Sequence, residues 1–361
     1  MSKTHVPFLL MAFLCACTQN ISTPRPTTAL VEEIASDRSD PRNMLLNGFG
    51  SPDRNGDIVL VGSERMCSHF SSALMEADMR DNVDAGLRPD GLSDFAGETV
   101  TSICDMEPDS TAGVEALRDK VVNLVLAAVD TVYNMARYDM EGQGRKQPAK
   151  VVVLCDAAYS VSGRFDVDTL FSLTGCGIPV YSPFESTLHS IIRRTSPVNI
   201  AVIGSSADVD AGVYETIARE QFARLRSRNS DIHAFSADSV GVLTALLDEY
   251  AAGSGERPLD VLVIDVPGVD VSLIREEAGR ILSLMCPESV TYGHLLSRGF
   301  SIIPTADVMC SVCYDALRST NLFTFKIAPP AASGYAAIAR PDGMEGGCLV
   351  VPQDNYVQDK R

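Results

Sequence analysis

Residues able to carry out acid–base chemistry stand directly after short apolar runs of this chain. Cys155 and Asp156 follow the run 151–154, and Asp265 follows the run 261–264. A thiol or a carboxyl group at such a position can release or take up a proton, and an ionised thiol can also act as a nucleophile. Hydroxyl groups and one more carboxylate follow two other runs, and they belong to Ser63, Ser205, Ser206 and Asp208. Together these groups could bind and protonate a small polar ligand.

The order of the apolar runs predicts how these residues come together. Six runs are short and uninterrupted, which is typical of strands buried on both faces of a parallel sheet. They span 58–61, 151–154, 178–180, 200–203, 261–264 and 301–303. Apolar residues at helical spacing lie between them, at 114–132, 240–247 and 273–285. Repeated strand–helix units predict an α/β fold with parallel strands, whose carboxyl ends would carry the site.

Four segments around these strands resemble the aspartate/glutamate racemase superfamily, and glutamate racemase most closely. The segment 151–157, VVVLCDA, resembles the family's strand that ends in Cys-Asn-Thr. The segment 199–214, NIAVIGSSADVDAGVY, is similar to "RIGVIGTPGTIKSGAY" and is the most specific match. The segment 177–185 is similar to "DIPVIGVVEP", and 259–268 stands where the family has "ADTLVLGCTHYP".

The resemblance implies two similar lobes, with mainly parallel sheets flanked by helices and a cleft between them. It places the first lobe at 56–180 and 285–328 and the second at 181–284, followed by an irregular tail at 329–361. It implies a racemase of small acidic amino acids that needs no cofactor and that can form oligomers. In that family one cysteine removes the α-proton and a second cysteine on the opposite face returns one, because inversion requires a base and an acid on opposing sides.

Matched residue by residue, the chain keeps part of that machinery. Cys155 occupies the first cysteine position, but the second falls on Val266, which has no ionisable group. We therefore expect a degenerate racemase in which two-thiol inversion is lost. Asp265 could replace the missing base, and a thiol of Cys67 or Cys286 opposite Cys155 would restore a pair.

Other positions of the pocket also depart from the family. Its Asp-Ser pair becomes Gly62 and Ser63, its Asn-Thr pair becomes Asp156 and Ala157, and one threonine becomes Asp208. Glu185 and Tyr214 match the family, and both can be structural; Glu185 is a further candidate for ligand binding. Three carboxylates at positions 156, 208 and 265 would repel a dicarboxylic amino acid by on the order of several kcal/mol.

Each candidate also has a structural interpretation. Cys155 could fill space at the strand end, and Asp208 and Asp265 could cap the helices that follow them. Glu185 and His189 are spaced for one helix face, where a solvated pair is favoured over a metal site. Cys310 and Cys313 are expected to be buried thiols on a helix. The alternative function is a membrane-anchored protein that binds a small ligand, or plays a structural role, without catalysis.

The first residues predict an export signal and a lipid anchor. Residues 1–17 combine Lys3, an apolar stretch and the sequence LCAC, which resembles a bacterial lipobox with Cys17 as the lipidated residue. Residues 18–55 are predicted to be a polar tether, and 80–110 a loop insertion. The protein would then be attached to a bacterial membrane, on the periplasmic face or in the outer membrane, and would be cytoplasmic if the signal is not used. A net charge of −17 argues against nucleic-acid binding.

Overall fold

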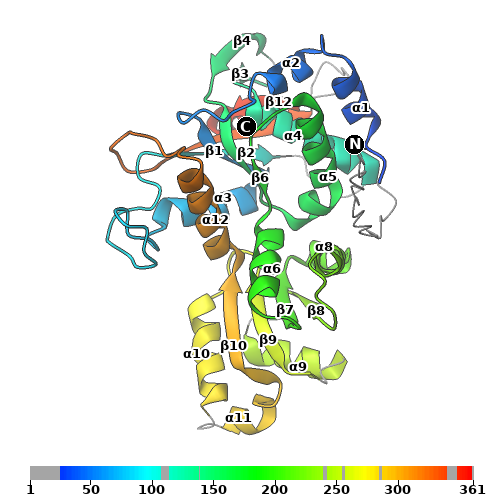
Figure 1. The fold of residues 1–361 in the computed structure, drawn as a ribbon, viewed down its shortest axis with the longest axis vertical. Helices are drawn as coiled ribbons and strands as arrows, with labels where there is room; N and C mark the ends of the chain where they lie inside the picture. Colours follow the sequence, from blue (N-terminus) through cyan, green and yellow to red (C-terminus); the bar gives the residue numbers. More distant parts are fainter. Residues whose placement is uncertain are drawn as a thin grey trace, which may run out of the picture.

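The computed structural model describes residues 25–106, 114–137, 139–238, 242–253, 257–283, 287–339 and 348–359, and it has two sheets with helices on both faces (Figure 1). The first sheet has the strand order β12–β11–β2–β1–β5–β6 and the second β10–β9–β7–β8. Neighbouring strands are parallel, except for the antiparallel pair β11–β12. The predicted α/β class, with mainly parallel sheets, is confirmed.

Five of the six apolar runs lie within strands, whereas the run 178–180 overlaps β6 only at Val180, and the structure has further strands that the runs did not predict. The first sheet consists of β1 (Asp57–Ser63), β2 (Thr99–Asp105), β5 (Ala149–Leu154), β6 (Val180–Tyr181), β11 (Ala331–Ala339) and β12 (Cys348–Pro352). The second consists of β7 (Asn199–Gly204), β8 (Asp231–Ser236), β9 (Leu259–Ile264) and β10 (Leu296–Pro304). A separate hairpin joins β3 (Val132–Ala136) and β4 (Asp139–Arg145).

Successive residues of β1 pack on opposite faces of the first sheet. Val59 and Val61 belong to a core formed with α4 (Val114–Val129) and α5 (Ala157–Thr174). Ile58 and Leu60 belong to a second core, formed with α3 (Glu64–Glu76) and α12 (Thr305–Ser319). Because both faces are covered, the strand is apolar throughout instead of alternating with polar residues.

The second sheet is covered in the same way. The helices α6 (Pro183–Arg194) and α8 (Val213–Arg224) pack on one face, and the short helix α7 (Ser206–Asp210) precedes α8. The other face carries α9 (Leu243–Gly253) and α10 (Val271–Leu282), and α11 (Pro287–Tyr292) follows α10.

The predicted lobe boundaries need correction at two places. Residues 296–304 were assigned to the first lobe, but they form β10, which pairs with β9 in the second sheet. The segment 329–361 is not an irregular tail, because β11 pairs with β2 along seven residues and α13 (Gln353–Asp359) follows β12. Its small residues pack closely on the sheet and give no strong hydrophobic signal. The predicted loop 80–110 likewise ends in strand β2.

The predicted tether at 18–55 is wrong for its described part. It contains α1 (Ala29–Ser36) and α2 (Pro41–Asn47), which bury Val31, Ile34 and Leu46 in the first lobe. A buried ion pair fixes the chain just before them. Arg118 donates to both carboxylate oxygens of Asp166 at 2.7 Å, and Asp166 also accepts from the backbone of Thr28 at 3.3 Å.

The predicted signal peptide, including Cys17, lies outside the described residues. Lipid attachment at that cysteine therefore stays a prediction. Among the helices of the described ranges, none has the length and apolar character needed to cross a membrane.

Replacing Asp166 with Ala should lower the free energy of unfolding by about 3–5 kcal/mol, because the buried Arg118 guanidinium would lose its countercharge. The Arg118 and Asp166 side chains are 6% and 0% exposed. Asp168→Ala is the matched control on the same helix, since Asp168 is 54% exposed and pairs with Arg164 at the surface; we expect a loss of at most about 1 kcal/mol. Urea unfolding would measure the loss of free energy of unfolding in both variants. Equal losses would contradict the stabilising role assigned to the buried Arg118–Asp166 ion pair.

Candidate active site at the junction of the two sheets

The strand ends that carry Cys155 and Asp265 have the same position in their two sheets. The amide of Cys155 donates to the carbonyl of Val61 at 2.8 Å, one step beyond the last pair of β1 and β5. The amide of Asp265 donates to the carbonyl of Ile203 at 2.9 Å, one step beyond the last pair of β7 and β9. By register, Asp265 is therefore the counterpart of Cys155 in the second lobe.

The thiol of Cys155 is directed into its own lobe. The residue is 1% exposed, and its Sγ contacts the carbonyl oxygen of Val153 at 3.7 Å. Burial raises the pKa of the Cys155 thiol, which disfavours the thiolate that a proton acceptor must form. This cysteine is a core residue in the described conformation.

A second thiol lies beside Cys155, within the same lobe. Cys67 is on α3, and the thiols of Cys104 and Cys155 both influence the pKa of its thiol. All three belong to one hydrophobic core. Cys67 therefore does not supply an opposing thiol from the other lobe. Cys286 lies outside the described residues.

Asp156 is the ionisable group that the first lobe presents next to Ser63. Its two carboxylate oxygens accept from the amide of Ser63 at 2.6 Å and from the hydroxyl of Ser63 at 2.8 Å. Gly62 makes this position possible, because a Cβ there would lie 2.3 Å from Oδ2 of Asp156. Burial raises the pKa of Asp156 to about 6, against the opposing effect of the two hydrogen bonds.

Asp265 is the most deeply buried carboxyl group of the second lobe's strand ends. It is 3% exposed, and its Oδ1 has no hydrogen-bond partner among the described residues. Burial raises the pKa of Asp265 to about 8. The expectation that it caps the next helix is wrong, because α10 begins at Val271 and Asp270 accepts from the amides of its first turn.

Asp208 completes a group of three carboxylates. Its charge raises the pKa values of both Asp156 and Asp265, and burial raises its own. Ser205 is the N-cap of α7 and accepts from the amide of Asp208 at 3.1 Å, so the serine and not the aspartate caps that helix. Ser206 is the first residue of α7 and is half-buried.

A contact between the lobes lies close to this group. Arg65, which follows the first residue of α3, donates from its guanidinium to the carbonyl of Pro267 at 3.0 Å. Since Pro267 comes two residues after Asp265, the contact brings the strand ends of the two sheets together. We call the group of Ser63, Asp156, Ser205, Ser206, Asp208 and Asp265 the junction site.

Glu185, which was also a candidate for ligand binding, has its partners outside the junction site. It lies on α6, accepts from the hydroxyl of Ser160 and pairs with Arg164 at 3.3 Å, so it links α6 to α5. The predicted Glu185–His189 spacing on one helix is confirmed, and no cluster of three or more His, Cys, Asp or Glu residues in the described ranges could hold a metal ion. Cys310 and Cys313 are buried thiols on α12, as predicted.

Sequence reasoning missed Asp105 at the end of β2. Its carboxylate pairs with Lys120 at 2.6 Å and accepts from the hydroxyl of Tyr159 at 2.5 Å, and its charge helps to raise the pKa of Asp156. The run 99–104 is short and rich in β-branched residues, which was a signal for a strand. The Asp- and Gly-rich residues before it hid that signal.

No protein-family model matches this chain, and no curated protein matches it. Solved structures with a similar fold include glutamate racemase from Francisella tularensis in complex with D-glutamate, at 13% identity and a TM-score of 0.49, with 78% of this chain and 88% of that chain covered. A glutamate racemase isoform from Bacillus anthracis has 14% identity and a TM-score of 0.48, and the match covers 84% of this chain and 99% of that chain. An aspartate racemase homologue from Pyrococcus horikoshii has 10% identity and a TM-score of 0.39, and the match covers 74% of this chain and 99% of that chain.

The raised pKa of Asp265 predicts a stability that falls with pH. Between the ordinary pKa of 3.8 and the folded value of about 8, the folded protein holds a proton that the unfolded chain has released. The free energy of unfolding must therefore decrease as pH rises through this interval, by up to about 1.4 kcal/mol per pH unit for one group. Asp265→Asn should remove about 1 kcal/mol per pH unit of this slope between pH 5 and 7.

Urea unfolding at several pH values would measure the slopes. The free energies of unfolding of the wild type and Asp265→Asn should differ least at pH 4, where the aspartate is neutral in the folded protein. Identical slopes for the two proteins would show that Asp265 is ionised in the fold at neutral pH.

Proposed function

We propose that this chain is a divergent member of the aspartate/glutamate racemase superfamily that has lost two-thiol racemisation, and that its junction site binds a small ligand bearing a cationic group. The observation that carries the proposal is the replacement of opposed thiols by carboxylates. Cys155 is buried in its own lobe, Val266 is part of the other lobe's core, and Asp156, Asp208 and Asp265 act on one another electrostatically.

The loss of racemisation follows from the position of the two strand ends. Inversion of an α-carbon requires a proton acceptor on one side and a proton donor on the other. A buried thiol with a raised pKa is a poor acceptor, and valine can neither donate nor accept. Thiol chemistry of the kind that the resemblance implies has no second partner here.

The resemblance and the geometry together explain one pair of substitutions. Where the family has Asp-Ser, this chain has Gly62 and Ser63, and where it has Asn-Thr, this chain has Asp156 and Ala157. The carboxylate of Asp156 occupies the space that a side chain at position 62 would need. We infer that a carboxylate moved from one strand to its neighbour, so that the site kept an acidic group at nearly the same place.

The preference for a cation follows from the charges at the junction. Asp208 raises the pKa values of Asp156 and Asp265, and Asp156 raises that of Asp265. A positive group near these carboxyl groups would stabilise their ionised forms. An acidic amino acid would add two negative charges to the same volume and would be repelled. A primary amine or a guanidine fits this charge pattern, whereas glutamate and aspartate do not.

We expect no α-deuterium in L- or D-glutamate or in L- or D-aspartate after incubation with the protein in deuterated water. Putrescine or agmatine should instead raise the melting temperature, because a ligand that binds only the folded state stabilises it. Asp208→Asn should abolish that rise, and Asp210→Asn, which changes an exposed residue of the same helix, should retain it.

Different results would overturn different parts of the proposal. Deuterium incorporation that disappears in Cys155→Ala would show that thiol racemisation persists. Stabilisation by glutamate but not by the two amines would reject the cationic ligand.

We further propose that a lipid on Cys17 attaches the protein to a bacterial membrane. The apolar stretch, the small residue Ala16 and the cysteine that follows it support this proposal. Radioactive palmitate should label the wild type and the Cys15→Ala control in bacterial cells, and Cys17→Ala should remain unlabelled. Equal labelling of the Cys17→Ala variant would reject attachment at this residue.

A further inference from the structure

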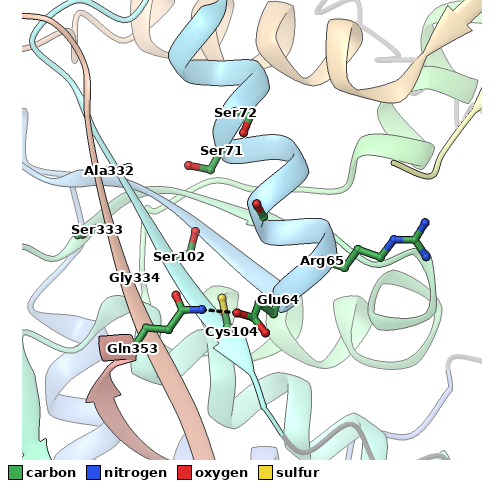
Figure 2. A pocket seen from close by; sticks show the side chains of 11 residues that line it. Glu64, Arg65, Ser71, Ser72, Ser102, Cys104, Ala332, Ser333, Gly334 and Gln353 are labelled. Atoms are coloured by element: carbon green, nitrogen blue, oxygen red, sulfur yellow. Dashed lines mark hydrogen bonds between the residues drawn. The ribbon is translucent and has the colours of Figure 1, made fainter. Parts of the chain in front are cut away.

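A groove of about 600 Å³ lies on the first lobe, between α3, β2, β11 and the start of α13 (Figure 2). This volume is in the range of small-molecule sites, which is roughly 300–1,000 Å³. The lining residues include none of the three junction aspartates. A ligand in this groove would therefore contact different groups from a ligand at the junction site.

Short polar side chains form the walls of the groove. The outer face of α3 carries Ser68, Ser71 and Ser72, at the spacing of one helix face, while its apolar residues pack in the core. Ser102 on β2 points from the floor toward that helix (Figure 2). On β11 the lining residues are small, so the space above the strand stays open; Gly334 is one of them.

The hydroxyl of Ser102 lacks a partner. The residue is 8% exposed, and no hydrogen bond of its side chain is found within the described part of the chain. The hydroxyls of Ser68, Ser71 and Ser72 have no protein partner within the described ranges either. Four hydroxyls without a protein partner in the described ranges thus face one groove, and each can donate one hydrogen bond and accept others.

The charges around the groove select against anions. Arg65 is the one basic residue among those that line it, and its guanidinium turns away and donates to the carbonyl of Pro267 at 3.0 Å. Glu64 accepts from the amide of Gln353 at 2.6 Å across the opening (Figure 2). A phosphate or carboxylate would meet an acidic group and no facing cation.

We propose that this groove binds an uncharged, polyhydroxylated molecule, either a sugar or a polyol. Such a ligand offers several hydroxyl groups that donate and accept, which matches the serine side chains of the walls. It needs no countercharge, which matches the absence of a facing cation among the lining residues. Ser102 is the most buried of the four serines, and we expect it to make the strongest single contact.

Saturation-transfer NMR on the full chain would test the proposal with D-glucose, N-acetyl-D-glucosamine and sorbitol as probes, and with glucose 6-phosphate as the charged counterpart. At least one uncharged probe should bind. Its dissociation constant should increase about tenfold in Ser102→Ala and several-fold in Ser71→Ala. Ser319→Ala, on the exposed end of α12, is the matched control and should bind as the wild type does.

Three results would overturn the proposal. The first is that none of the uncharged probes binds at tens of millimolar. The second is equal affinity of the wild type and Ser102→Ala, which would place the ligand elsewhere. The third is tighter binding of glucose 6-phosphate than of glucose, which would mean that the groove selects an anion. Since each substitution only truncates a small side chain, a folding defect is not expected, and circular dichroism of each variant would verify this.

Discussion

The junction depends on one constraint: three carboxyl groups interact electrostatically at the strand ends, and burial raises the pKa of each of them. Asp265 has an oxygen with no partner in the described protein, and Asp156 is retained in its place by two hydrogen bonds from Ser63. A buried carboxylate is costly, so such groups take up protons or attract positive charge. The two lobes meet at this point, and the protonation of the aspartates therefore affects both stability and the choice of ligand.

The same strand ends decide which chemical groups this chain can offer to a ligand. A parallel α/β sheet presents its chemistry at the carboxyl ends of its strands, and single substitutions there change function without changing the fold. Cys155 and Asp265 hold equivalent positions by register, yet both side chains are buried. The groups that the strand ends leave for a ligand are carboxylates and serine hydroxyls.

The first lobe has a second, chemically different surface. The groove between α3 and β2 is lined by hydroxyls, whereas the junction is lined by three carboxyl groups. Arg65 connects the two regions, because it borders the groove and bridges to Pro267 of the second lobe. The bridge turns the one basic lining side chain away from the groove, so the two regions present different chemical groups.

The sequence alone determined the strand–helix alternation, six of the strands and the set of polar residues at their ends, because buried parallel strands are short apolar runs that local pattern reveals. It could not reveal β11, β12, α1 and α2, whose small or polar sequences are ordered by contacts with distant residues, such as the Arg118–Asp166 pair. It also could not decide which strand-end side chains point outward. Only the tertiary structure decided that Cys155 points into the core, that Asp156 fills the space above Gly62 and that Glu185 links two helices, since burial and pairing depend on neighbours far away in the chain.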